Sequence, residues 1–212
     1  LVGFFFYEKI IKFLLDILSL KGINIVFTSP FQFINLAFSS GIACGRIVSF
    51  PLLVSQILYF LKPALREKEY KTVIRLLPFS FLLFLTGVTF GFLIMKWQIM
   101  IFLDRSLALG IGNILDISSL LTTVLLTSAL MGLGFQFPII LLLLLHLGII
   151  SHKQLTNKRR WVYLGSFLFA ILLPPDSILA DILLASPLVI LFEITLILNW
   201  ALTRKKPQEK ID

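Results

Sequence analysis

The chain has 212 residues, of which 58% are hydrophobic and only 14% are charged, and its mean hydropathy is +0.99. Soluble domains are about half apolar and about a quarter charged, and several runs here reach the ~20 residues that span a bilayer, so these values exclude a soluble globular domain. The net charge of +8 does not indicate a nucleic-acid partner, because most bases lie in short loops between apolar runs, as they do in membrane proteins.

The first two segments are an apolar start and an amphipathic stretch. Residues 1–6 (LVGFFF) look like the end of a span whose beginning is absent, so the first transmembrane helix is expected to be largely missing from this chain. In residues 7–28 apolar side chains recur at helical spacing between charged ones, which predicts an amphipathic helix along the outer membrane surface. Ser29-Pro30 is expected to end this helix.

Five membrane spans are predicted after this segment. They cover approximately residues 35–61, 76–95, 118–147, 161–173 and 182–200, and residues 96–117 read as a polar connection. The 161–173 span supplies only about 20 Å of helix against a hydrocarbon core of about 30 Å. It therefore either begins within the preceding basic loop or thins the bilayer around it. A tight LPPDSILAD turn joins the last two spans.

The basic residues gather in three segments. Five lie in residues 62–75, four in residues 151–160 and four in the tail, residues 204–212. With the predicted spans, all three segments fall on one face of the membrane, and the positive-inside rule places that face in the cytoplasm. We therefore expect a single transmembrane domain, residues 1–203, followed by a basic cytoplasmic tail, and six helices as the natural whole.

Three polar side chains lie inside predicted spans, where such groups are costly and are therefore functional candidates. Glu193 is either a functional group or a protonated or paired structural carboxyl. Arg46 either pairs with an acid on another helix or extends its guanidinium to the outer surface. Gln136 either has a function or satisfies carbonyls that the nearby Pro138 leaves free.

Two further patterns concern helix packing and catalysis. The spacings Gly41–Gly45 and Gly87–Gly91 are both GxxxG, which lets helices approach closely. The sequence contains no GxxxxGK[ST] and no HExxH, and two histidines and one cysteine cannot build a conventional all-protein metal site. We expect no enzyme, no metal site and no cofactor.

Several short motifs run in order from about residue 28 to residue 200. They are TSPFQF (28–33), Phe60, Pro63, Leu65 and Glu69 in the first basic loop, MGLGFQFPIILLLLLHLGII (131–150), Arg159-Arg160, the turn residues Pro174, Pro175 and Asp176, and LLASPLVILFEI (183–194). Together they resemble the TatC family, the multi-spanning core of the twin-arginine protein translocase. On this resemblance we expect the family's first span and its N-terminal acidic motif to be missing from this chain, and Gln136 stands where many members carry Glu.

The resemblance implies an all-α integral membrane protein with a six-helix TatC-type bundle that binds twin-arginine signal peptides. It assigns recognition to Glu69 and, less strongly, Glu67, with Phe60, Pro63 and Leu65 beside them. Two consecutive guanidiniums need carboxylates that accept paired hydrogen bonds. The alternative is that Glu67 and Glu69 only neutralise the charge of this basic loop. Gln136, Glu193 and Arg46 would then offer contacts within the membrane, and the Pro174–Asp176 segment would form a structural turn.

The resemblance also implies partners and a location. The partners are TatA-like and TatB-like single-span subunits, precursor signal peptides and other copies of this chain, and folded proteins are moved by the proton-motive force. The location is the bacterial cytoplasmic membrane or, alternatively, a thylakoid or mitochondrial inner membrane. The competing class is a permease subunit for a small solute, which would predict repeated halves.

Overall fold

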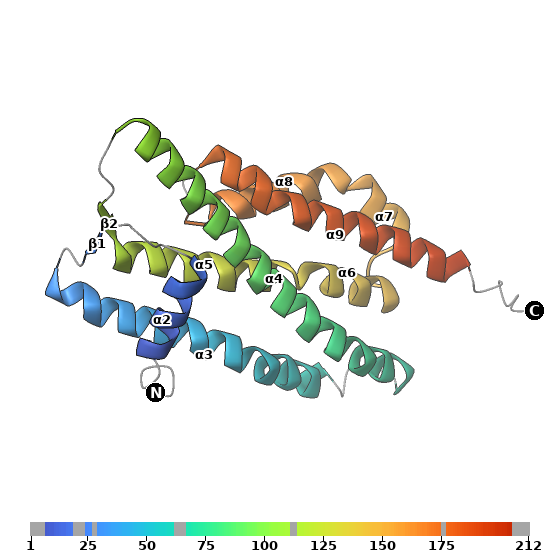
Figure 1. The fold of residues 1–212 in the computed structure, drawn as a ribbon. Coiled ribbons are helices and arrows are strands. Elements are labelled where there is room, and N and C mark those ends of the chain that lie inside the picture. Colours follow the sequence, from blue (N-terminus) through green and yellow to red (C-terminus); the bar gives the residue numbers. More distant parts are fainter. Residues whose placement is uncertain are drawn as a thin grey trace, which may run out of the picture.

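The computed structural model describes residues 7–18, 24–26, 29–61, 67–110, 114–174 and 177–204, and nearly all of them are helical (Figure 1). The helices are α2 (Tyr7–Leu18), α3 (Pro30–Leu61), α4 (Glu67–Ala108), α5 (Ile117–Gly134), α6 (Phe137–His146), α7 (His152–Asn157), α8 (Arg159–Ile171) and α9 (Ile178–Arg204). The all-α fold class is confirmed. Two three-residue strands, β1 (Asn24–Val26) and β2 (Ile114–Asp116), also pair in parallel, which the sequence did not predict.

Within the described residues, three helical stretches are long and apolar enough to cross a membrane. They are Val73–Ala108, Ile117–His146 and Ile178–Asn199. α3 and α8 cover the other two predicted spans as helices, and their crossing of the membrane stays a prediction. In the amphipathic segment predicted at 7–28, α2 is helical over Tyr7–Leu18, whereas residues 24–26 form β1, so the predicted helix is wrong there. The position of α2 on the outer surface stays a prediction.

α4 is far longer than the 76–95 span predicted for this region. It runs for 42 residues, so the polar connection predicted at 96–117 is wrong over residues 96–108. The helix continues because Met95, Ile99 and Leu103 recur every four residues and are all buried against the core. At ~1.5 Å per residue α4 is about 63 Å long, so it must extend beyond a hydrocarbon core of about 30 Å.

The closest helix contact joins α4 to α5. A Cβ built on Gly87 would lie 2.7 Å from the carbonyl oxygen of Met131, and one built on Gly91 would lie 2.9 Å from the Cα of Ser128. Only glycine allows this approach, so the packing predicted from the Gly87–Gly91 spacing is confirmed. Among the described residues, a Cβ on Gly45 would meet nothing within 4 Å, so no close approach is seen at that position and the packing predicted from the Gly41–Gly45 spacing stays a prediction.

The predicted 118–147 span is interrupted between α5 and α6. Pro138 lies at the start of α6, where its missing N–H costs least. The backbone N–H of Gln136 donates to the Leu133 carbonyl, and the Gln136 carbonyl accepts from Ile139 and Ile140. The break therefore keeps its backbone hydrogen bonds, and α5 and α6 together still form one apolar stretch, Ile117–His146, that is long enough to cross a membrane.

The bundle has two distinct ends in Figure 1. α3, α6 and α9 end, and α4 and α7 begin, at the right of the view, whereas β1, β2 and the starts of α3, α5 and α9 lie at the left. The described bases of segments 67–75 and 151–160 therefore belong to the same end, which we call the basic end. This arrangement is the one that the positive-inside rule requires of a multi-spanning protein.

Candidate functional site

The first basic segment joins α3 to α4 at the basic end. Phe60 lies in the last turn of α3, Glu67 is the first residue of α4, and Glu69 lies in its first turn. Pro63 and Leu65 fall outside the described residues. The first turn of a helix favours acidic side chains because the helix dipole is positive there. Their position in the first turn of α4 thus gives both glutamates a candidate role in stabilising the helix start, which the charge pattern of the loop did not reveal.

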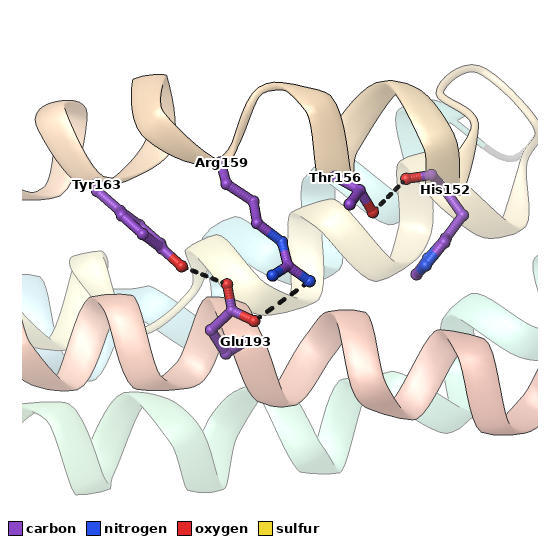
Figure 2. A network of polar contacts seen from close by, with 5 residues as sticks. All are labelled: His152, Thr156, Arg159, Tyr163 and Glu193. Atoms are coloured by element: carbon purple, nitrogen blue, oxygen red, sulfur yellow. Dashed lines mark hydrogen bonds and ion pairs between the residues drawn. The ribbon is translucent and has the colours of Figure 1, made fainter.

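Glu193 lies at the centre of a polar cluster between α8 and α9 (Figure 2). The Tyr163 hydroxyl donates to Glu193 Oε1 at 2.5 Å, and Arg159 Nη2 lies 3.5 Å from Glu193 Oε2. Arg159 and Tyr163 are four residues apart, so both face α9 from the same side of α8. The paired alternative for Glu193 is therefore the one observed, and a contact with a peptide or partner stays a prediction.

A second polar group ties α7 to α9 beside this cluster. The ring Nδ1 of His152 lies 3.3 Å from Asn199 Nδ2, and the Thr156 hydroxyl donates to the His152 carbonyl at 2.9 Å (Figure 2). Ser151 and Gln154 form a capping box that fixes the start of α7. Of these contacts, the one between His152 and Asn199 reaches α9, and with the Glu193 cluster it holds the short helices α7 and α8 against α9 at the basic end.

Gln136 lies at the break between α5 and α6 and is buried, with 9% of its surface exposed. The Ser80 hydroxyl of α4 donates to Gln136 Oε1 at 2.5 Å, and Gln136 Nε2 donates to the Ser80 carbonyl at 3.1 Å. The prediction that Gln136 satisfies carbonyls freed by Pro138 is therefore wrong, because its amide bonds another helix. A contact with peptide or partner stays a prediction.

The remaining predicted site residues are only partly described. Arg46 lies within α3, but its side chain is outside the described part of the molecule, so both alternatives stay open. Pro174 lies in a bend after α8, whereas Pro175 and Asp176 fall outside the described residues. Among the residues that were described, no group of three or more His, Cys, Asp or Glu could hold a metal ion.

The sequence carries only a weak indication of the site residues that were not predicted, Tyr163, His152 and Asn199. Arg159 and Tyr163 share a helix face by their spacing, which could have indicated that both approach the same neighbour. That the neighbour carries Glu193 depends on how α8 and α9 pack, and no local pattern gives this. Tyr163, His152 and Asn199 were therefore not predicted as site residues.

The fold and these interhelical contacts define a multi-spanning α-helical membrane protein. Residues 1–187 match the family model described as "Sec-independent protein translocase protein (TatC)". The chain belongs to the TatC family, and is thus a component of Sec-independent protein translocation with a membrane location. No catalytic activity follows from this membership, and it favours translocation over the alternative of a small-solute permease subunit.

The relatives agree with this assignment over nearly the whole chain. The chain is 32% identical to TatCy of Bacillus subtilis (strain 168), covering 97% of this chain and 81% of that protein. It is 28% identical to TatC of Aquifex aeolicus (strain VF5), covering 98% and 88%. A crystal structure described as the twin arginine translocase receptor TatC in DDM matches with a TM-score of 0.82 at 27% identity, covering 93% of this chain and 89% of that one. The TatC-type bundle is therefore confirmed.

Proposed function

We propose that this chain is the receptor subunit that binds twin-arginine signal peptides at its basic end, with Glu69 as the recognition carboxylate. The observation that carries the proposal is the position of Glu69, which lies in the first turn of α4 at the basic end of a TatC-family chain. Nearby bases repel an arginine pair, so a carboxylate is needed to accept its paired hydrogen bonds. Glu67 assists, and Phe60, Pro63 and Leu65 supply apolar contacts.

The proposed location is the bacterial cytoplasmic membrane, with the basic end and the C-terminus in the cytoplasm. Support comes from the shared end of the basic segments and from the bacterial source of the relatives named above. There the chain self-associates and works with TatA-like and TatB-like single-span subunits, and the proton-motive force drives export of folded proteins. α8 has only 13 residues, about 20 Å of helix, which suits local thinning of the bilayer.

The two polar residues within the spans have different roles in this proposal. Glu193 keeps 30% of its side chain exposed, so a polar group of a partner helix can reach it and replace Arg159 or Tyr163. Gln136 is buried and its amide is bound to Ser80, so it acts on the shape of the bundle. We therefore assign the partner contact to Glu193 before Gln136.

Crosslinking of a twin-arginine precursor to the chain in membrane vesicles tests the receptor proposal. Glu69→Gln keeps the shape of the side chain and removes its charge. Charged hydrogen bonds contribute about 1.5–3 kcal/mol, so we expect crosslinking that depends on the arginine pair to fall about 10-fold or more. Glu67→Gln is the matched control and should have the smaller effect.

The alternative role of the glutamates makes a different prediction. If both acids only stabilise the start of α4, Glu67→Gln and Glu69→Gln should lower the free energy of unfolding by similar amounts, about 0.3–1 kcal/mol each. A precursor with a Lys-Lys signal should then crosslink as well as one with Arg-Arg. Equal crosslinking of both precursors, unchanged by Glu69→Gln, would move recognition away from this helix start.

A further inference from the structure

A cavity of about 580 Å³ beside α8 belongs to none of the contacts described above. One face of α8 lines it, from Lys158 through Trp161 and Gly165 to Phe169, and Gly134 and Phe137 lie on the opposite wall. The distance along α8 from residue 158 to residue 169 is about 16 Å at ~1.5 Å per residue. The cavity is therefore a slot that starts at the basic end and follows α8 toward the middle of the bundle.

The walls of this slot are apolar except at its mouth. Lys158 is the only charged residue among those that line it, and the lining Ser166 hydroxyl donates to the Val162 carbonyl of its own helix. Arg159, the next residue, is directed to α9 by Glu193. Trp161 has 72% of its surface exposed near the mouth, a position typical of tryptophan at a membrane–water interface.

The mouth of the slot has a second feature that favours an anion. Lys158 is the N-cap residue of α8, and since the lysine side chain has no acceptor, the first N–H groups of α8 have no side-chain cap there, although the Trp161 N–H donates to the Lys158 carbonyl. The first N–H groups of a helix attract phosphate through the helix dipole. An ammonium group, an uncapped helix start and an apolar slot together fit a ligand with an anionic head and a hydrocarbon tail.

We propose that this cavity binds an anionic phospholipid, with one acyl chain in the slot and the phosphate at Lys158 and the start of α8. The volume lies within the range of about 300–1,000 Å³ that is usual for small-molecule sites. The single ammonium group at the mouth of an otherwise apolar slot matches an anionic headgroup joined to an acyl chain, so charge favours a lipid over an apolar partner helix. The proposal does not rest on signal-peptide binding.

Gly165 provides a way to fill the slot without disturbing the packing around it. A Cβ built on Gly165 would meet nothing within 4 Å, so a larger side chain there enters open space. Gly165→Phe should therefore occupy the slot, and Lys158→Glu should reverse the charge at its mouth. Lys153→Glu is the matched charge control, because Lys153 is also exposed in the same basic segment but does not line the cavity.

The test uses the purified chain in phosphatidylcholine vesicles that contain phosphatidylglycerol with a photoreactive acyl chain. We expect mass spectrometry to find the label on residues 161–169, and Gly165→Phe to remove it. Lys158→Glu should lower phosphatidylglycerol labelling about fivefold or more, since one basic residue near a membrane surface changes anionic-lipid binding by about that factor. Lys153→Glu should leave phosphatidylglycerol labelling unchanged. Labelling by a phosphatidylcholine probe with the same reactive chain should not respond to Lys158→Glu.

Two results would overturn the proposal. The first is equal labelling by both probes together with no effect of Lys158→Glu, which would show that no headgroup is recognised. The second is lipid labelling that Gly165→Phe leaves unchanged while the same variant loses a co-expressed single-span subunit, which would make the slot a helix-docking site. Thermal unfolding of each variant checks the fold, and Lys158→Glu tests the headgroup contact without filling the slot.

Discussion

Gln136 and Glu193 are both polar residues in predicted spans, yet their surroundings differ. Gln136 is buried at a helix break and bonded in both directions to Ser80, whereas Glu193 is partly exposed and bonded to Tyr163 and Arg159. A buried amide without a partner is costly, so Gln136 fixes the position of α4 against the break. The two residues should therefore respond differently to substitution, and Gln136 should act mainly on stability.

Gln136→Leu and Ser80→Ala test this pair at the scale of single residues. Each should lower the free energy of unfolding by about 1 kcal/mol, and their coupling should lie near the values of about 0.6–1.7 kcal/mol found for hydrogen bonds in membrane proteins. Unfolding of the two single variants and the double variant in detergent micelles gives this coupling directly.

Thr89→Val is the matched control for this cycle. The Thr89 hydroxyl is exposed and bonds only the Leu85 carbonyl of its own helix, so its loss should change stability by a few tenths of a kcal/mol. Strictly additive effects of Gln136→Leu and Ser80→Ala would contradict the proposed contact between α4 and the helix break.

At the scale of whole elements, α4 and α5 pack so closely at their glycines that an added Cβ would overlap the neighbouring helix. Gly132 of α5 also faces α4, since its Cβ would lie 2.7 Å from Val88 Cγ2. Gly91→Leu should therefore separate the two helices and lower stability by about 1–3 kcal/mol or more. Thermal unfolding in detergent measures this, and Gly45→Leu should cost far less because that position faces open space. Leucine favours a helix more than glycine does, so helix propensity cannot produce a loss at either position. Similar losses from both variants would therefore contradict the assignment of the effect to the close α4–α5 contact.

The sequence predicted the helices well because apolar runs and their spacing are local signals. It did not predict the end of α4, because Lys96 and Arg105 suggested a connection although Met95, Ile99 and Leu103 continue the buried stripe. α8 starts two residues earlier than predicted but also ends two residues earlier, so its short length was predictable. The strand pair was not, because it joins segments about 90 residues apart with only three residues each.

The candidate site was predictable in part for the same reason. Glu193, Gln136 and the glutamates of the first basic loop are conspicuous because charged and amide groups are rare among apolar residues. The partners of Gln136 and Glu193 are not conspicuous, since Ser80 and Tyr163 are ordinary residues until the helices pack. Sequence thus identifies the costly groups, and the tertiary structure decides what satisfies them.

At the scale of the whole molecule, the distribution of bases and the direction of the helices together predict which end of the bundle lies on which side of the membrane. Lys153 lies at the basic end, and Ser177 lies between α8 and α9 at the opposite end. Cys44 is the only cysteine, so Cys44→Ser gives a background in which Lys153→Cys and Ser177→Cys can each be labelled alone.

An impermeant maleimide should react with Lys153→Cys only from the cytoplasmic side and with Ser177→Cys only from the other side. The reason is that the positive-inside rule orients the basic end, and α8 must then cross the membrane despite its 13 residues. Inside-out and right-side-out vesicles supply the two sides, and detergent supplies full labelling as the control. Labelling of both positions from one side would mean that α8 and α9 do not form a spanning hairpin, and the thinning of the bilayer proposed around α8 would lose its structural basis.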